Sequence, residues 1–196
     1  MKTLIAELEG ISPLGFTNFV AAEKLQGENS KDYESRTWRD RLHVDDKDNV
    51  IIPPMMFKNC LSGIAKFLGL QIPGKGKSTY TKHIEAGVMV TEPLVLPIKK
   101  QDVKGLWLLV PSDGVRGGGK RVEKCFPVIQ EWSGEVPFII LDDTVLSEYS
   151  KVKGRVVTVF EYHLVEAGKF QGIGFFRPRN NGYFGRFKVN KIREAD

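Results

Sequence analysis

Hydrophobic and polar residues alternate over residues 2–11, where Leu4, Ala6 and Leu8 fall on one face. A period of two predicts a strand with one buried side. Short apolar runs bounded by turn residues predict further strands. These runs lie at residues 49–52, 86–91, 105–110, 122–131, 135–141 and 183–192. The strands at 122–131 and 135–141 are expected to form a hairpin around residues 132–135.

Two segments have the spacing of an amphipathic helix. The first begins at Pro53-Pro54, which suits a first helical turn, and is expected to end near Gly69, since glycine is a common terminator. Its apolar face contains Phe57, Cys60, Leu61, Ile64 and Leu68. The second helix is predicted over 144–167, with Asp142-Asp143 as its cap and Gly168 at its end.

The resulting order of elements, β-α-β-β-β-β-α-β, predicts an α+β fold with helices packed on an antiparallel sheet. At 196 residues the chain suits one domain. Residues 20–48 are a polar insertion, partly helical around 33–42, and loops of that length are usually functional or disordered. Residues 111–124 form a second, basic loop.

The charge is distributed unevenly along the chain. The net charge is +5, yet residues 23–48 carry eight acids against six bases, whereas residues 169–193 carry seven Lys or Arg and no acid. Such asymmetry favours a polyanion partner bound by one face.

The remaining composition excludes several classes of protein. Cys60 and Cys125 have apolar neighbours and are interpreted as buried thiols of a reducing compartment. No CxxC, HExxH or paired-histidine spacing is present, so neither a metal nor a cofactor is expected. No apolar run is long enough for a membrane span or a signal peptide, which predicts a cytoplasmic protein.

The segment 166–189 combines glycines, aromatic side chains and arginines. Glycine lets backbone N–H groups approach an anion, arginine binds phosphate in a forked geometry, and aromatic faces stack on bases. The combination favours single-stranded nucleic acid. The alternative is a strand-turn-strand unit whose aromatic side chains belong to the core.

Two further loops are basic and contain glycine. Residues 73–83 resemble a phosphate-binding P-loop only superficially, because Gln71 stands where that motif requires glycine. They nevertheless supply phosphate contacts and a stacking face, and residues 115–121 add another basic tip. The alternative is that both loops are solvated surface loops.

Catalytic chemistry has little support in the sequence. His43 and His83 are candidates for the general base of a metal-free RNA cleavage. Structural histidines without an orienting partner are the commoner explanation. Asp142-Asp143 offer two carboxylates for a metal, but helix capping accounts for them.

The chain resembles the RAMP (repeat-associated mysterious protein) superfamily of CRISPR systems, in particular the backbone subunit that coats guide RNA. Residues 50–61 resemble the family's strand and "I-P-x-x-x-hydrophobic-K-x-x-L" helix, and Lys58 occupies the position that faces RNA. The predicted long helix into Ala167-Gly168, with residues 172–174 and 182–187, resembles its C-terminal glycine-rich element. The resemblance implies a modified RRM: a ferredoxin-like antiparallel sheet with two helices and an inserted thumb-like loop, here 20–48 or 111–124.

We therefore expect a non-catalytic, guide-RNA-binding subunit that self-associates head to tail into a filament with other CRISPR effector subunits. Single-stranded DNA is a second possible ligand. The expected RNA-binding residues are Lys58, Lys75, Lys77, Tyr80, Lys82, Arg116, Lys120, Arg121, Phe175, Arg177, Arg179, Tyr183 and Arg186. Two alternatives stay open: a phage-encoded mimic of the subunit acting as an anti-CRISPR inhibitor, and a metal-independent guide-processing endoribonuclease.

Overall fold

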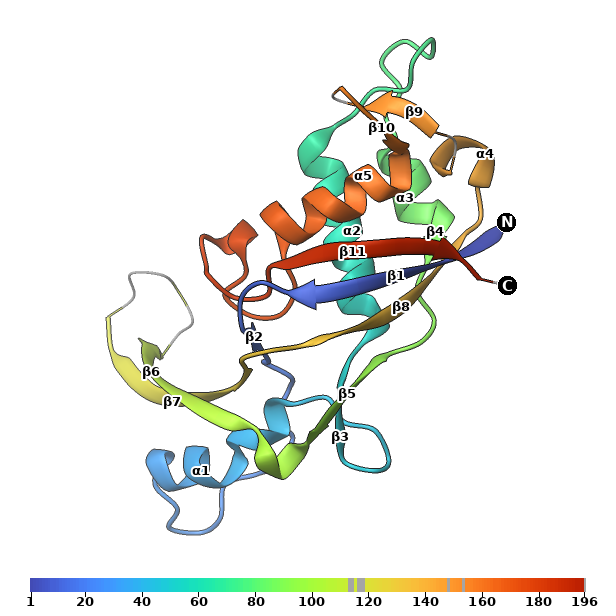
Figure 1. The fold of residues 1–196 in the computed structure, drawn as a ribbon. Coiled ribbons are helices and arrows are strands. Elements are labelled where there is room, and N and C mark those ends of the chain that lie inside the picture. The colour runs from blue at the N-terminus through green and yellow to red at the C-terminus, as the bar shows by residue number, and fades with distance from the viewer. Residues whose placement is uncertain (113–114, 116–118, 148, 153, 196) are drawn as a thin grey trace.

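The computed structural model describes residues 1–112, 115, 119–147, 149–152 and 154–195. Within them the chain is an α+β fold with antiparallel sheets (Figure 1). The largest sheet has four strands in the order β11-β1-β8-β4. Their bounds are β1 (Lys2–Gly10), β4 (Val88–Met89), β8 (Ser133–Ile140) and β11 (Phe187–Glu194). The predicted strand at 2–11 is thus confirmed as the sheet's second strand.

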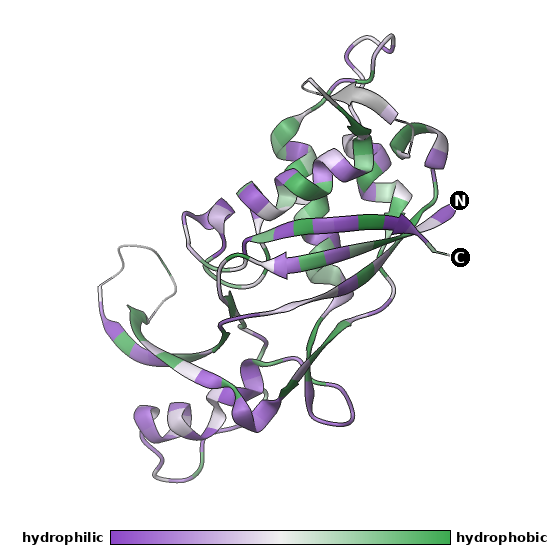
Figure 2. Ribbon diagram, in the orientation of Figure 1, coloured by the Kyte–Doolittle hydropathy of each residue, from purple (hydrophilic) through white to green (hydrophobic). Residues whose placement is uncertain are grey.

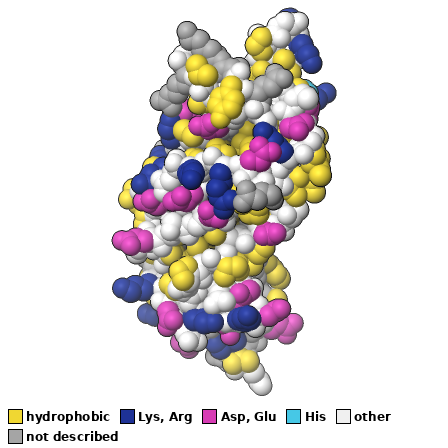
Figure 3. All heavy atoms as spheres, turned by 45° about the vertical axis from the view of Figure 1, so that its right-hand side comes forward, with side chains coloured by type: hydrophobic (Ala, Val, Ile, Leu, Met, Phe, Trp, Pro, Cys, Tyr) yellow, Lys and Arg dark blue, Asp and Glu magenta, His cyan; other side chains and the backbone are white. Residues whose placement is uncertain are grey.

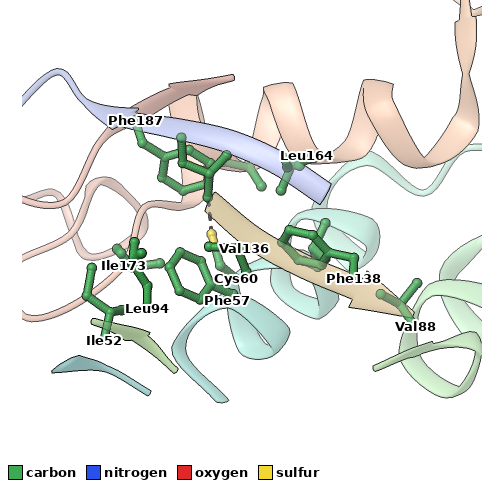
Figure 4. Packing of buried hydrophobic residues seen from close by; sticks show 14 of the residues in the cluster. Ile52, Phe57, Cys60, Val88, Leu94, Val136, Phe138, Leu164, Ile173 and Phe187 are labelled. Carbon is green, nitrogen blue, oxygen red and sulfur yellow. Dashed lines mark hydrogen bonds between the residues drawn. The ribbon is translucent and has the colours of Figure 1, made fainter. Parts of the chain in front are cut away.

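One face of this sheet is covered by two helices, α2 (Pro54–Leu68) and α5 (Val159–Glu166). Phe57 and Cys60 of α2 and Leu164 of α5 pack with Val136 and Phe138 of β8 in a single core (Figure 4). The predicted bounds of the first helix are confirmed, because Pro54 starts it and Gly69 ends it in the left-handed conformation, at φ 53°.

The opposite face of the sheet mixes charged side chains with the apolar Ile5, Pro137, Ile139 and Met89, and it has no aromatic side chain at the outward positions of its described strands. Alternation along β1 and β11 is visible as alternating hydrophilic and hydrophobic residues (Figure 2). Lys188 pairs with Glu9 and Arg193 with Glu135, each at 3.0 Å. Basic and acidic side chains are interspersed on the side of the molecule that carries the termini (Figure 3). This face therefore lacks the rings of a base-stacking platform.

A second lobe consists of two insertions between strands of the main sheet. The first contains β2 (Leu14–Gly15), α1 (Ser30–Thr37), η1 (Trp38–Arg41) and β3 (Asn49–Ile52). The second contains β5 (Leu94–Lys99), η2 (Lys100–Asp102), β6 (Lys104–Pro111) and β7 (Arg121–Ile129). The insertions pair with each other, β2 with β7 and β3 with β5. The described parts of both segments expected to supply a thumb-like loop thus lie in one lobe.

The predicted helix at 144–167 is wrong in its first half. The chain forms a short α4 (Asp143–Leu146), then strands β9 (Tyr149–Val152) and β10 (Arg155–Thr158), before α5 begins. Gly154 makes the turn at φ 85°. The β-branched residues 156–158 favour a strand over a helix. Thr158 then caps α5 by accepting a hydrogen bond from the Glu161 amide at 3.0 Å.

The predicted hairpin of strands 122–131 and 135–141 is also wrong. Both strands exist, but β7 pairs with β6 from Arg121 to Val128, and β8 pairs with β1. The chain crosses between the sheets at Trp132, which is buried and packs edge-on against Phe187 at 6.1 Å. Burial of this indole in the main core explains why no tight turn forms there.

Three short helices complete the described chain. These are α3 (Thr81–Gly87), a π-helical turn η3 (Ala167–Gln171) directly after α5, and η4 (Pro178–Asn180). Because α3 extends to Gly87, the strand expected at 86–91 is reduced to Val88–Met89. No helix among the described residues combines the length and the apolar content that a membrane span requires.

Candidate nucleic-acid interface

The glycine-rich segment 172–186 connects η3 to β11 and docks on β2. The Phe175 amide donates to the Gly15 carbonyl at 3.1 Å, and the Gly185 amide donates to the Pro13 carbonyl at 2.8 Å. Its own ends are joined by a bond from the Ile173 amide to the Gly185 carbonyl at 3.0 Å. The segment is therefore an ordered part of the second lobe's boundary.

Close backbone contacts explain three of the glycines in this segment. Gly172, Gly174 and Gly185 have φ between 64° and 74°, where a side chain is strained. A Cβ on Gly174 would lie 2.4 Å from the Gly15 carbonyl oxygen, and a Cβ on Gly185 would lie 1.8 Å from that of Ile173. These glycines serve the fold, as the strand-turn-strand alternative anticipated, and need no anion to account for them.

Phe175 lies in the middle of a stack of three rings. Its ring is 4.5 Å from Phe126 of β7 and 5.2 Å from Phe184, with interplanar angles of 13° and 21°. It is buried, with 8% of its surface exposed. A base would reach this ring only by displacing a phenylalanine. The stack instead joins the glycine-rich segment 172–186 to the β6–β7 hairpin. The base contact expected of Phe175 stays a prediction.

Two adjoining pockets, which share Thr17, lie between the second lobe and the glycine-rich segment 172–186. We call them together the inter-lobe groove. The larger, about 540 Å³, lies between the β6–β7 hairpin and the segment around Phe176. The smaller, about 250 Å³, lies at the start of α2. The groove is lined by Thr17, Arg41, His43, Pro53, Met55, Met56, Asn59, Leu109, Val110, Pro111, Arg121, Lys124, Phe126, Gly174, Phe176, Arg177, Asn180 and Asn181.

The groove is cationic. Arg41, Arg121, Lys124 and Arg177 line it, and none of its described lining residues is a carboxylate; Arg41 is itself paired with the buried Glu34. Lys124 and Arg177 make no hydrogen bond or ion pair with any residue that the structure describes, so their charges are free to meet a ligand. Among the described residues, Arg121 donates only to the Leu109 carbonyl, at 3.3 Å. Unpaired cations without nearby acids are what a phosphate backbone requires.

The expected RNA-binding residues separate into distinct places. Arg121 and Arg177 line the groove, Lys120 and Tyr183 are exposed on the segments that border it, and Arg179 lies on η4 beside it. The loop 69–80 and the start of α3 lie at the opposite end of the molecule (Figure 1). That end carries Lys75, Lys77, Tyr80 and Lys82. Arg116 lies outside the described residues.

Lys58 and Arg186 are engaged within the fold. The Lys58 amine donates to the carbonyls of Ile84 and Glu85 at 2.8 and 2.6 Å, which ties α2 to the last turn of α3. Partial burial lowers the pKa of this amine. The Arg186 guanidinium donates to the carbonyls of Lys169 and Tyr183, both at 3.3 Å. RNA contacts by these residues stay predictions, and each side chain would have to leave its carbonyls to make them.

The two candidate histidines differ in their surroundings. His43 lines the groove, and burial lowers its pKa, which favours the neutral ring. No described residue orients that ring, since the Asp45 carboxylate instead accepts from the amides of Lys47 and Asn49. His83 does have an orienting partner, because its Nδ1 lies 2.8 Å from the Asp142 carboxylate. This pair lies beside Lys82, away from the groove.

Helix capping does not explain Asp142-Asp143, contrary to the sequence-based interpretation. The Asp142 side chain makes no cap bond to α4 and instead binds His83 and the Thr144 hydroxyl. Asp143 pairs with the N-terminal amine at 3.0 Å. The described residues contain no group of three or more His, Cys, Asp or Glu arranged to hold a metal ion.

Several groove residues were missed in the sequence. Arg41 belongs to the acidic insertion, and Lys124 belongs to a strand whose partner was misassigned, so neither was considered for binding. Asn180 and Asn181 show no charge signal. The pairing of Arg41 with Glu34, seven residues earlier, places this arginine beside β7, and no pattern in the sequence indicated it. No protein-family model matches the chain, and no curated protein sequence is significantly similar to it.

Proposed function

We propose that the inter-lobe groove binds single-stranded RNA and that the chain is a guide-RNA-binding backbone subunit of the RAMP type. The order of the main-sheet elements supports the ferredoxin-like, modified RRM fold in this proposal. Along the chain they run β1, α2, β4, β8, α5 and β11, and in space the strands lie in the order β11-β1-β8-β4. With both helices on one face, this order supports the proposed β-α-β-β-α-β arrangement.

The observation that carries the proposal is a set of three cations, Arg121, Lys124 and Arg177, that line a groove between two lobes and have no carboxylate partner among the described residues. The fourth, Arg41, is held by Glu34. A polyanion gains affinity from each phosphate that displaces counterions, and an acid in the groove would oppose this. Asn180 and Asn181 add hydrogen-bonding side chains. Phe176 and Tyr183 are 45% and 62% exposed and offer ring faces to unstacked bases.

The second lobe takes the part of the thumb in this proposal. It is built from both expected insertions, and α1 and η1 pack against β7. An RNA strand lying in the groove would pass between this lobe and the C-terminal segment. Head-to-tail contacts between copies would then let one strand run through successive grooves.

The direct test is RNA affinity measured by fluorescence anisotropy over a range of salt concentrations. Arg121→Ala, Lys124→Ala and Arg177→Ala should each weaken binding, and each lost phosphate contact should reduce the slope of log affinity against log salt by about 0.7. Lys191→Ala removes an exposed charge from the opposite sheet face and is the matched control. Equal effects of all four variants would reject the groove as the binding site.

The same assay tests whether the second predicted set of cations, in the loop 69–80, also binds RNA. Lys75→Ala combined with Lys77→Ala removes two exposed charges from the distant loop. If RNA occupies the groove alone, this variant behaves like the control. A loss as large as that of the groove variants would show that the strand also crosses the loop 69–80.

Native purification from the host distinguishes a working subunit from an inhibitory mimic. A backbone subunit should bring guide RNA of defined length together with the other effector subunits in an active complex. A mimic should bring the same subunits in a complex that no longer cuts its target. Purification as a nucleic-acid-free monomer would contradict both.

The His83–Asp142 pair favours a second candidate, metal-independent RNA cleavage. A carboxylate on Nδ1 fixes the ring tautomer, so that Nε2 can accept the proton of a 2′-hydroxyl. The oxygen would then attack the adjacent phosphate and release a 5′-hydroxyl product, leaving a cyclic phosphate. Cleavage of a repeat hairpin in EDTA that is lost in His83→Ala and retained in His43→Ala would support it. Intact RNA after long incubation would reject it.

A further inference from the structure

Phe67 and Phe170 form an exposed aromatic pair next to the groove. Phe67 is the penultimate residue of α2 and Phe170 belongs to η3; they are 72% and 53% exposed. Their ring centroids lie 6.3 Å apart at 32°, whereas the buried Phe126–Phe175 rings are 4.5 Å apart. The two rings are in contact, yet both are largely exposed, so part of each remains accessible to a third ring.

Gln171 lies beside this pair with an unused hydrogen-bond donor. Its side chain is buried, with 3% of the residue exposed, and its Nε2 has no hydrogen-bond partner among the described residues. A buried amide without a partner costs roughly 1–3 kcal/mol, so such groups usually have a purpose. An acceptor atom on a ligand would remove that cost if the amide, which is now covered beside Gly63, turned toward the pocket.

The backbone around Gln171 is arranged to accommodate this amide. Gly63 lies in the interior of α2, where glycine is unfavourable, and a Cβ there would lie 2.4 Å from the Gln171 Nε2. Phe170 and Gln171 both belong to the π-helical turn η3. π-helical turns are rare in proteins, and those that occur are often found at functional sites.

Cations border the same pocket. It is lined by Gly63, Lys66, Phe67, Phe170, Gln171, Pro178 and Arg179, with no carboxylate among them, and its volume is about 510 Å³. Lys66 pairs with Glu85 at 2.8 Å, but Arg179 is exposed and makes no hydrogen bond or ion pair with a described residue. The helix η4 joins the pocket to the groove, since Arg177 and Asn180 line the groove while Pro178 and Arg179 line the pocket.

We propose that this pocket binds one unstacked nucleobase of the RNA, stacked on Phe67 or Phe170, with an acceptor on its edge bonded to the Gln171 amide. Arg179 would hold the adjoining phosphate. The pocket volume suits a ligand of nucleotide size. An apolar protein side chain would leave the Gln171 donor unsatisfied and Arg179 unpaired, which is why a base fits better. The inference rests on the proposed function of the groove.

The experiment uses the whole chain and an oligouridylate that carries one 2-aminopurine, whose fluorescence falls when it stacks. Phe170→Leu removes a ring from the pocket and should weaken binding about tenfold, with loss of the quenching, while the salt slope is unchanged. Gln171→Met keeps the side-chain length and removes the donor. It should weaken binding and change the ranking of oligouridylate, oligoadenylate and oligocytidylate.

Tyr149→Leu is the matched control, because this tyrosine is 75% exposed on β9, outside the pocket and the groove. It should leave affinity and quenching as in the wild type. Thermal unfolding of each variant identifies any loss of binding that follows from unfolding, and Phe67→Leu provides a second variant if Phe170→Leu fails to fold.

Failure of this inference is separable from failure of the proposed function. If the wild type binds no RNA, the groove proposal falls as well. If the groove variants weaken binding while Phe170→Leu, Phe67→Leu and Gln171→Met leave affinity, quenching and base ranking unchanged, only the base pocket is rejected. Loss of self-association in Phe170→Leu without any change in RNA affinity would also reject it, and would assign the aromatic pair to an interface between copies.

Discussion

Arg41 and Glu34 form a buried ion pair, 2.8 Å between nitrogen and oxygen, that also binds the backbone of Cys125 on β7. The Glu34 carboxylate accepts from the Cys125 amide at 2.7 Å, and Arg41 donates to the Cys125 carbonyl at 3.2 Å. Both backbone groups of one strand residue are thus satisfied by the polar insertion. The pair fixes α1 and η1 against the β6–β7 hairpin and so fixes one wall of the groove.

Removing one member of this pair should strongly destabilise the protein. Glu34→Ala leaves a buried guanidinium without its carboxylate and should lower the free energy of unfolding by about 3–5 kcal/mol, as measured in urea. The double variant Glu34→Leu with Arg41→Met should lose less than Glu34→Ala, because no buried charge remains. A larger loss in the double variant would mean that the pair contributes mainly through its bonds to Cys125.

Phe175 and Tyr183, both expected to stack on bases, should respond differently to truncation. Phe175→Ala removes the middle ring of a buried stack and should cost about 3–5 kcal/mol of stability. Tyr183→Ala, at an exposed ring, should change stability by less than about 0.5 kcal/mol. Thermal and urea unfolding give the stabilities, and RNA anisotropy tests whether Tyr183→Ala weakens binding. A stable Phe175→Ala with weakened RNA binding would restore Phe175 as a contact residue.

The elements that the sequence predicts well are those whose periodicity and boundary residues agree. β1 alternates strictly, and α2 has proline at its start, an apolar stripe and Gly69 at its end. The 144–167 segment has a helical stripe too, but its β-branched residues and Gly154 favour a hairpin, and that local preference decides the outcome. Periodicity alone therefore misleads where propensity opposes it.

The groove is less predictable because it depends on pairing between distant segments. Strand β7 pairs with β6 and β2 in the second lobe, and this pairing decides where Arg121 and Lys124 lie. Local composition pointed to Arg177, which lines the groove, and to Tyr183, which borders it. It could not show that Phe175 is buried or that Lys58 reaches the end of α3, since both facts depend on neighbours distant in sequence.

Lys58 should contribute measurably to stability. Lys58→Met removes a charged donor from the carbonyls of Ile84 and Glu85 and should cost about 1.5–3 kcal/mol in urea unfolding. Lys66→Met on the same helix breaks only an exposed ion pair and should cost less than about 1 kcal/mol. Equal losses would show that the Lys58 bonds are dispensable.

The same lysine also permits a test of its expected RNA contact. Lys58→Met combined with Arg186→Ala should reduce RNA affinity and its salt dependence if both side chains leave their carbonyls to bind phosphates. Unchanged affinity and slope in the folded double variant would limit both residues to the fold.

The His83–Asp142 pair should make stability depend on pH. The hydrogen bond from His83 holds the pKa of Asp142 below its ordinary value. A carboxyl group whose pKa is lower in the folded than in the unfolded protein stabilises the folded state. This stabilisation is fully present above the unfolded pKa, about 3.9, and is lost as the pH falls through the lower pKa of the folded state. Asp142→Asn should therefore melt below the wild type near neutral pH, and the two melting temperatures should converge below about pH 4.

Glu92→Gln, at an exposed carboxylate with no described partner, should run parallel to the wild type. A difference between Asp142→Asn and the wild type that stays constant into acid would mean that the pair contributes no charge-dependent stability.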